Sequence, residues 1–263
     1  MKEPVIESLV SIRNLKDVRD VKSFIKKANI LEDVLLINQV ENKQPILKYK
    51  EEKIRTISFN EKGVARSRNR ALEYANGDIC LFTDDDIKYE NNYKDIVLEA
   101  YNKYKKADMI IFYVESLSKD RKLKKIKEGK IHWIDIMRVV SSEITFKINK
   151  MKNKKINFNE NFGPGGSFLM GEETVFLNEC LKKGLKIYSV PVKIGTVENK
   201  ESTWFKGYNE KYFYDQGAIF KELQPRLYKL LILQYVLRKY SLYKNKFKMK
   251  EIYVIMNNGA NHK

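Results

Sequence analysis

The sequence predicts an α/β protein with a doubly wound, mostly parallel sheet and a helical extension at its C-terminal end. Short apolar runs, such as residues 34–37 and 79–83, have the length and composition of strands buried on both faces. Segments with apolar residues at helical spacing alternate with these runs, as in strand–helix–strand units. The 263 residues, 43% of them hydrophobic, are enough to bury the core of such a domain.

The first half of the chain predicts two strand–helix–strand units. Residues 5–12 are mostly apolar and predict the first strand. In residues 17–28 the apolar side chains recur three or four positions apart, which predicts a helix. The other expected elements of this half are strands at residues 34–37, 53–59 and 79–83, and a helix at residues 63–75.

The second half continues the alternation and ends in helices. Residues 91–105 and 172–183 have helical spacing, and Gly184 closes the second of these helices as a C-cap. Residues 115–135 are basic and irregular, so we expect a mobile surface excursion there. The expected strands of this half are residues 109–114, 142–148 and 185–190.

Three consecutive aspartates, Asp84, Asp85 and Asp86, follow the strand predicted at residues 79–83. In sheets of this class, ligands bind just beyond the carboxyl ends of the strands. Adjacent carboxylates repel one another unless a cation gathers them, and their oxygen atoms suit Mg²⁺ or Mn²⁺. Magnesium sites often combine one or two carboxylates with substrate phosphates, so the triplet predicts a metal-held diphosphate. A solvated acidic loop is the alternative.

Three segments in this order resemble motifs of family 2 glycosyltransferases. Residues 63–78 resemble the helix that precedes the metal strand, and the aspartate triplet resembles the family's Asp-X-Asp motif. Residues 162–173, Phe-Gly-Pro-Gly-Gly-Ser-Phe-Leu-Met-Gly-Glu-Glu, resemble its Gly-rich acceptor loop and acidic pair. The resemblance covers residues 1–205 and implies a GT-A nucleotide-sugar-binding and catalytic domain. Residues 206–263 are then a helical, basic C-terminal extension.

The resemblance implies a glycosyltransferase of the bacterial surface-polysaccharide type. It would transfer a hexose or N-acetylhexosamine, with inversion, from a nucleotide diphosphate sugar to a glycan or lipid-linked glycan. Asp86 would be the principal ligand of Mn²⁺ or Mg²⁺, with Asp84 beside it on the ribose side. Asp85, in the variable middle position, would belong with Asp84 to the residues that bind the nucleotide-sugar donor. Glu173 aligns with the family's catalytic base, where Asp is more usual, and Glu172 would position it.

Other positions concern the nucleotide and the sugars. Arg68 aligns with the family's arginine near the nucleotide, and loop glycines would border donor and acceptor. Asn38 and Gln39 stand where relatives end the second strand with an Asp pair that recognises uracil. A side-chain carbonyl could accept the same hydrogen bond, so UDP is the expected nucleotide while the base stays open. The loop glycines are Gly163, Gly165 and Gly166.

One metal ligand common among relatives has no counterpart here. Relatives often place a histidine after the last core strand, but residues 192–204 contain none, and His132 lies far upstream. The resemblance therefore implies that the metal rests on Asp86, diphosphate and water, or that metal dependence is weaker. For His132 itself, an ordinary surface or packing role is the better interpretation.

The net charge of +17 suits nucleic acid, an anionic membrane or acidic ligands as partners, and a Lys- and Asn-rich proteome is the alternative explanation. Residues 221–250 contain nine Lys or Arg and a single acid, Glu222. No zinc-finger or RNA-binding signature accompanies this charge, so nucleic acid is the weaker hypothesis. The apolar stretch at residues 227–240 is shorter than the roughly 20 residues of a membrane span. It could pack on the core, dock in the plane of an anionic membrane or form a dimer, and the sequence leaves the oligomeric state open.

The N-terminal residues do not have the pattern of a signal peptide, and Cys80 and Cys180 suggest neither zinc nor a disulfide framework. We therefore expect a cytoplasmic protein, peripheral at the inner face of the membrane. Two rival functions stay open. One is a sugar nucleotidyltransferase, although residues 11–14 lack the glycines of its phosphate loop. The other is a non-catalytic basic scaffold that binds membrane or an anionic partner.

Overall fold

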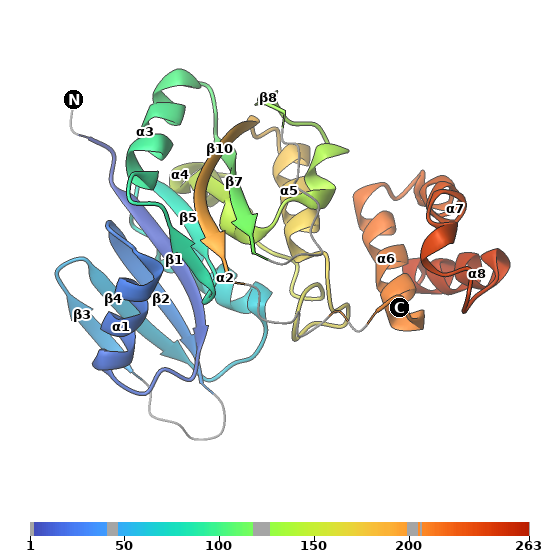
Figure 1. The fold of residues 1–263 in the computed structure, drawn as a ribbon, viewed down its shortest axis with the longest axis horizontal. Coiled ribbons are helices and arrows are strands. Elements are labelled where there is room, and N and C mark those ends of the chain that lie inside the picture. The colour runs from blue at the N-terminus through green and yellow to red at the C-terminus, as the bar shows by residue number, and fades with distance from the viewer. Residues whose placement is uncertain (1–2, 41–46, 118–126, 199–204, 206, 263) are drawn as a thin grey trace.

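The computed structural model describes residues 3–40, 47–117, 127–198, 205 and 207–262. A ten-stranded sheet forms the centre of the molecule, and three C-terminal helices stand beside it (Figure 1). The strands are β1 (Ile6–Arg13), β2 (Asp33–Gln39), β3 (Lys48–Glu51), β4 (Ile54–Phe59), β5 (Ile79–Thr83), β6 (Ile87–Tyr89), β7 (Met109–Ser116), β8 (Gly129–Lys130), β9 (Ile144–Lys147) and β10 (Ile187–Val197).

The sheet has the order β3-β4-β2-β1-β5-β9-β7-β10-β6, and β8 pairs with β10. Strands β4, β2, β1 and β5 are parallel neighbours, and β7 and β10 are a second parallel pair. Strand β9 lies antiparallel between β5 and β7 and joins the two groups. Among the described strands, every antiparallel pair includes β3, β6, β8 or β9. The predicted fold class, a mostly parallel α/β sheet, is confirmed.

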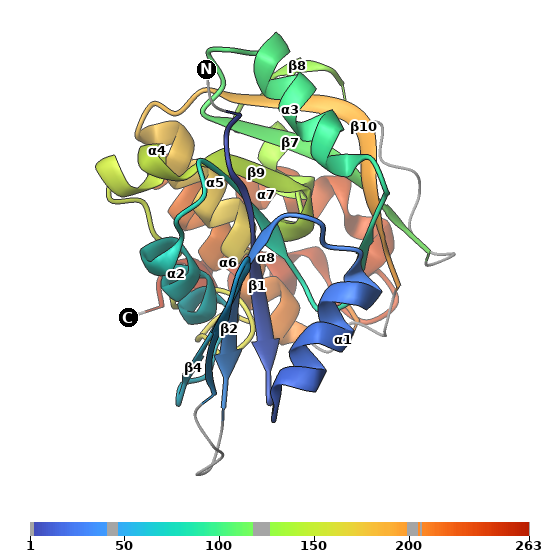
Figure 2. The same cartoon turned by 90° about the vertical axis from the view of Figure 1, so that its left-hand side faces the viewer.

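Helices cover both faces of the sheet, because successive side chains of a strand point to opposite faces. Leu35 and Phe82 belong to one buried core and Leu36 and Leu81 to the other. Figure 2 shows α1 and α3 on one side of the strands and α2, α4 and α5 on the other. These helices are α1 (Val18–Ala28), α2 (Val64–Tyr74), α3 (Tyr93–Lys103), α4 (Ile148–Asn153) and α5 (Glu172–Lys182).

Two expectations for the middle of the chain need correction. The strand expected at residues 142–148 begins as a 3₁₀ turn, Ser141–Glu143, and β9 already passes into α4 after Lys147. We also expected a surface excursion at residues 115–135, of which residues 118–126 lie outside the described residues. For residues 127–135 this expectation is wrong. There β8 pairs with β10 and Ile131 is buried. Isolated isoleucines among lysines have no periodicity, so the sequence pattern conceals their burial.

The C-terminal helices, α6 (Glu210–Leu223), α7 (Tyr228–Arg238) and α8 (Met249–Ala260), pack on the core through α5. Phe213 and Leu223 belong to the same buried cluster as Phe176 of α5. The tail therefore shares its core with the sheet, while the predicted boundary between residues 1–205 and 206–263 stays a prediction. Among the helices of the described residues, none has the length and apolarity that crossing a membrane requires.

Helices α6 and α8 cross with their backbones in contact, which only glycine permits. A Cβ atom on Gly217 would lie 1.9 Å from the carbonyl oxygen of Met256, and one on Gly259 would lie 1.9 Å from that of Tyr214. Both crossing points are inside helices, where glycine otherwise weakens the helix. The close approach of the two backbones explains why glycine occupies them.

We expect Gly259→Ala to destabilise the protein by about 2–3 kcal/mol, because the added methyl group forces α6 and α8 apart. At an ordinary helix position the same change stabilises by about 0.5–1 kcal/mol. Urea denaturation followed by circular dichroism measures the difference. Asn258→Ala, at the exposed neighbouring position, is the control and should be neutral or slightly stabilising. A stabilised Gly259→Ala variant would contradict the close packing.

Candidate active site

The aspartate triplet lies at the carboxyl end of β5, in the middle of the sheet. Strand β1 flanks β5 on one side and β9 on the other. Asp84 and Asp86 are half-buried, and Asp85 is exposed. Two hydrogen bonds hold the turn. The Thr83 and Tyr89 hydroxyls are 2.8 Å apart, and the Glu198 amide donates to the Asp86 carbonyl at 3.0 Å. The triplet is therefore part of an ordered turn between β5 and β6.

The Gly-rich loop packs directly on the first turn of α2. The Val64 amide donates to the Pro164 carbonyl at 3.0 Å, so the loop caps a helix that has no side-chain cap. Gly165 has a φ of 96°, and a Cβ there would lie 2.6 Å from the Cα of Gly63. Gly163 has a φ of 89°, and a Cβ there would lie 2.8 Å from the carboxyl carbon of Glu172. Glycine at these positions brings α2 and α5 together.

Arg68, on the second turn of α2, gathers three carboxylates. Its guanidinium donates to Asp84 Oδ1 at 3.1 Å, to Glu173 Oε1 at 3.3 Å and to Glu172 Oε1 at 3.5 Å. The acids come from the end of β5 and from the first turn of α5. The Ser141 hydroxyl donates to the other Asp84 oxygen at 2.5 Å. The Arg68 guanidinium thus contacts both acidic motifs identified in the sequence, the aspartate triplet and the pair of glutamates that begins α5.

Aromatic side chains pack against the Arg68 guanidinium. Arg68 is 3% exposed, and its Cζ lies 5.5 Å from the centroid of the Phe158 ring. Phe158 stacks on Phe176 with 4.0 Å between centroids and meets Phe82 edge-on at 5.3 Å. Because this surrounding excludes water, the attraction between the guanidinium and its carboxylates is only weakly screened.

Burial and charge set the protonation of the cluster. Burial alone would lower the pKa of Arg68, but its carboxylate partners, Asp84 foremost, raise it, so the guanidinium stays charged. Burial, followed by the neighbouring Glu173 carboxylate, raises the pKa of Glu172 from 4.5 to about 8, although Arg68 opposes the shift. At neutral pH this environment therefore favours the protonated form of Glu172.

Two residues predicted to contact the nucleotide, Asn38 and Gln39, are buried and hydrogen-bonded within the protein. Asn38 is fully buried, and its amide bonds the Leu15 backbone in both directions and the Ser58 hydroxyl. Gln39 is 4% exposed and donates to the Gly63 carbonyl at 2.9 Å. Both side chains brace the loops at the ends of β1 and β4. The geometry also gives Arg68 a role in organising acids, so direct contact of these three residues with a nucleotide stays a prediction.

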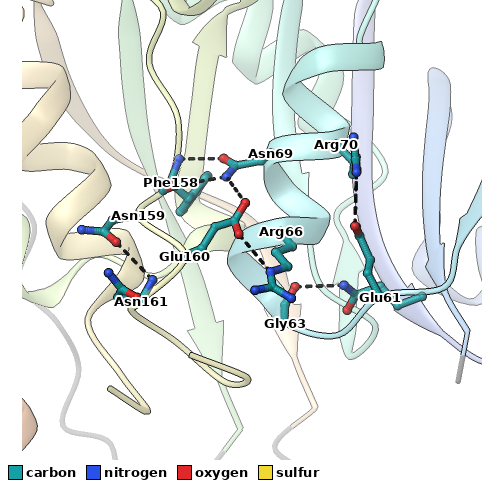
Figure 3. Close-up of polar contacts among 10 residues, drawn as sticks. Glu61, Gly63, Arg66, Asn69, Arg70, Phe158, Asn159, Glu160 and Asn161 are labelled. Atoms are coloured by element: carbon teal, nitrogen blue, oxygen red, sulfur yellow. Dashed lines mark hydrogen bonds and ion pairs between the residues drawn. The ribbon is translucent and has the colours of Figure 1, made fainter. Parts of the chain in front are cut away.

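A second polar layer, which the sequence patterns did not single out, holds the loop before the Gly-rich segment (Figure 3). The Asn69 side chain accepts from the Phe158 amide at 2.7 Å and donates to the Phe158 carbonyl at 3.1 Å. Arg66 donates to Glu160 at 2.9 Å. Asn69 and Arg66 come from α2, so one helix positions both Arg68 and the ring beneath it. Asn69 directly follows Arg68, and this adjacency is the only local signal for its role.

The C-terminal extension holds the other end of the loop. Asp215 of α6, which is 1% exposed, accepts from the Leu169 amide at 2.9 Å. Lys211, one turn earlier, donates to the Ser167 carbonyl at 2.7 Å and pairs with Asp215. The segment that leads into Glu172 is therefore fixed by residues about 45 positions further along the chain. No local pattern in the sequence predicts these contacts.

The donor atoms at the triplet fit a hard divalent cation, since all are carboxylate oxygens. Within the described ranges, no group of three or more His, Cys, Asp or Glu side chains is arranged to hold a metal. Both oxygens of Asp84 are engaged by Arg68 and Ser141. A cation here would therefore need Asp86 and further oxygen atoms from a ligand, as in magnesium sites completed by phosphates.

Comparison with known proteins identifies a family that spans these residues. The family described as Glycosyl transferase family 2 matches residues 38–175, more than half of the chain. The matched segment includes α2, the aspartate triplet, the Gly-rich loop and both acids of α5. Comparison with curated protein sequences gives no match.

Solved structures of S. aureus TarS share the fold. The complex of residues 1–349 with UDP-GlcNAc aligns with a TM-score of 0.64 at 12% identity, covering 97% of this chain and 80% of that chain. The same fragment without a named ligand gives 0.62 at 11% identity, covering 98% and 81%. Its complex with UDP gives 0.61 at 12% identity, covering 94% and 76%.

We expect Arg68→Met to destabilise the protein by about 3 kcal/mol, because it leaves two partly buried carboxylates, Asp84 and Glu173, without their cation. Thermal and urea unfolding of the full chain measure the loss. Arg66→Met is the matched control: it removes an arginine of the same helix that is half-exposed in its pair with Glu160. That change should cost less than about 1 kcal/mol. Equal stability of the two variants would contradict the organising role of Arg68.

The raised pKa of Glu172 predicts how stability depends on pH. Folding favours the protonated carboxyl, so the stabilisation is complete below the unfolded pKa of 4.5 and is lost as pH rises through about 8. Between about pH 7 and 9 the wild type should lose about 1 kcal/mol more unfolding free energy than Glu172→Gln. Urea titrations across this range test the difference, and parallel curves would contradict it.

Proposed function

The chain belongs to glycosyl transferase family 2, and we propose that it transfers a hexose or N-acetylhexosamine from a UDP-sugar to a hydroxyl group of a glycan. The observation that carries the proposal is the Arg68 cluster. It links Asp84 at the end of β5 to the acidic pair of α5, and this proximity supports a donor site at the first segment and a base on the second. The complexes of S. aureus TarS with UDP-GlcNAc and with UDP support UDP as the nucleotide.

The reaction we propose is a single inverting displacement. The acceptor oxygen attacks the anomeric carbon and forms the new C–O bond, while the bond to the diphosphate oxygen breaks and its electron pair leaves with the diphosphate. Glu173 takes the proton of the attacking hydroxyl as general base. Glu172, protonated and buried against Gly163, keeps its neighbour in place. A carboxyl pair in which one member holds the proton suits this division of roles.

Negative charge builds on the leaving diphosphate, and Asp86 with Asp84 would hold the Mn²⁺ or Mg²⁺ that offsets it. When bound, the cation acts as a Lewis acid that stabilises the departing oxygen by several kcal/mol. Arg68 keeps Asp84 oriented toward the turn, and Ser141 fixes its second oxygen. The chain's own contribution is an Asp84 side chain held in one orientation at the strand end.

The acceptor we propose is a glycan or a lipid-linked glycan at the inner, cytoplasmic face of a membrane. The support is the charge of residues 221–250, nine basic residues against one acid. Anionic lipid attracts such segments. A lipid-linked acceptor lies in the same surface, so attraction to the membrane would concentrate enzyme and acceptor together.

Calorimetric titration with UDP, GDP, dTDP and CMP, each with Mn²⁺ and with EDTA, tests the donor proposal. We expect binding of UDP that depends on the cation, and weak binding of the other nucleotides. Asp86→Ala should weaken UDP binding and abolish transfer. Glu173→Gln should keep UDP binding but lower transfer by about 10²-fold or more, because only the base is lost.

Matched variants separate these roles from general loss of charge. Asp95→Ala removes an exposed aspartate of α3, and Glu179→Gln removes a half-exposed acid of α5 that pairs with Lys183. Both should bind UDP and transfer sugar as the wild type does. Full turnover by Asp86→Ala or Glu173→Gln would remove that residue from the mechanism, and binding of no nucleotide would reject the donor proposal.

A further inference from the structure

Helix α7 has a second apolar face that folding does not use. Four leucines spaced three or four residues apart project from one side of the helix and expose 46–62% of their surface. Tyr240, one turn beyond, is 40% exposed. We call these five residues the leucine stripe; the leucines are Leu227, Leu230, Leu233 and Leu237. Isolated exposed leucines are ordinary, but a continuous row on one helix face marks an interaction surface.

The stripe lies opposite the face that α7 packs against the protein. Tyr228, Ile232 and Val236 are buried and belong to the core shared with α6 and α8. Figure 1 shows α7 on the outer side of the extension, away from the sheet. The helix is therefore already anchored by one apolar face, and the leucine stripe is turned outward.

Basic side chains frame the stripe. At 100° per residue, Lys229 and Arg238 fall on its two edges, and Arg226 lies at its first turn. All three are exposed, and within the described part of the chain none of them forms an ion pair. Lys239 and further lysines continue the charge beyond the helix. An apolar strip with cationic edges matches a surface of acyl chains beneath anionic headgroups, where long basic side chains reach the headgroups.

The same charges argue against a second copy of this chain. A symmetric dimer through the leucine stripe would bring the two sets of basic edges together. Helix α7 contains no acid, so the facing helix would offer no complementary charge. We propose that the leucine stripe docks α7 in the plane of an anionic phospholipid surface. The helix has 11 residues and a length of roughly 16 Å, which suits lying in the interface and cannot span a bilayer.

This inference does not depend on the proposed reaction, and vesicle binding tests it directly. Full-length protein should co-sediment with phosphatidylglycerol-rich vesicles and only weakly with pure phosphatidylcholine vesicles, and the difference should shrink in high salt. Leu230→Gln/Leu237→Gln should weaken binding at least about tenfold by removing the inserted apolar groups. Lys229→Gln/Arg238→Gln should weaken it about tenfold on phosphatidylglycerol alone.

Matched controls use the same chemistry elsewhere on the surface. Leu31→Gln/Val192→Gln removes two exposed apolar groups of the α/β domain, and Lys48→Gln/Lys50→Gln removes two exposed charges of β3. Both should bind vesicles within about twofold of the wild type, because one pair of distant charges contributes little. UDP binding and thermal unfolding of every variant establish that the fold is intact.

Three outcomes would overturn the proposal. Equal vesicle binding by the stripe variant and its control would show that other residues make the contact. Absence of wild-type binding to phosphatidylglycerol would reject a lipid surface. A wild-type dimer that Leu230→Gln/Leu237→Gln dissociates in sedimentation velocity, with vesicle binding unchanged, would assign the stripe to a second copy. Because none of these readouts measures transfer, each is distinguishable from failure of the proposed reaction.

Discussion

The structure depends on one buried guanidinium. An arginine removed from water costs several kcal/mol unless carboxylates surround it, and the surrounding carboxylates equally need the arginine. Arg68 is 3% exposed and satisfies this condition with Asp84, Glu172 and Glu173. Helix α2, the end of β5 and the start of α5 must therefore meet at one point. That meeting point is where we propose that the transfer takes place.

The Gly-rich loop leaves the space that this charge cluster needs. Residues with a Cβ at Gly163 or Gly165 would displace the Glu172 carboxyl or the N-terminus of α2. The loop then needs support on its outer side, and α6 supplies it through Asp215 and Lys211. The helical extension consequently acts as part of the site's scaffold. The leucine stripe on the outward face of the extension makes none of these contacts and is available for a separate surface function.

Much of the fold could be predicted from local pattern. Buried parallel strands such as β2 and β5 are continuous apolar runs, and α1 carries its apolar residues at helical spacing, so period and length identify them. Short elements escaped prediction because they hold too few residues to show a period. Strand β3 is polar and mostly exposed, and β8 has two residues, so each exists only through pairing with a neighbour.

The sequence by itself determined which chemical groups stand at the ends of elements, because a triplet of aspartates after an apolar run and a glycine loop before two glutamates are local patterns. Only the tertiary structure decided their partners. Arg68 is 16, 104 and 105 residues from its three carboxylates, and Asp215 is 46 residues from the amide it holds. It also decided that Asn38 and Gln39 face inward. Burial and long-range pairing set the charge and direction of a side chain, and neither is encoded in its immediate neighbours.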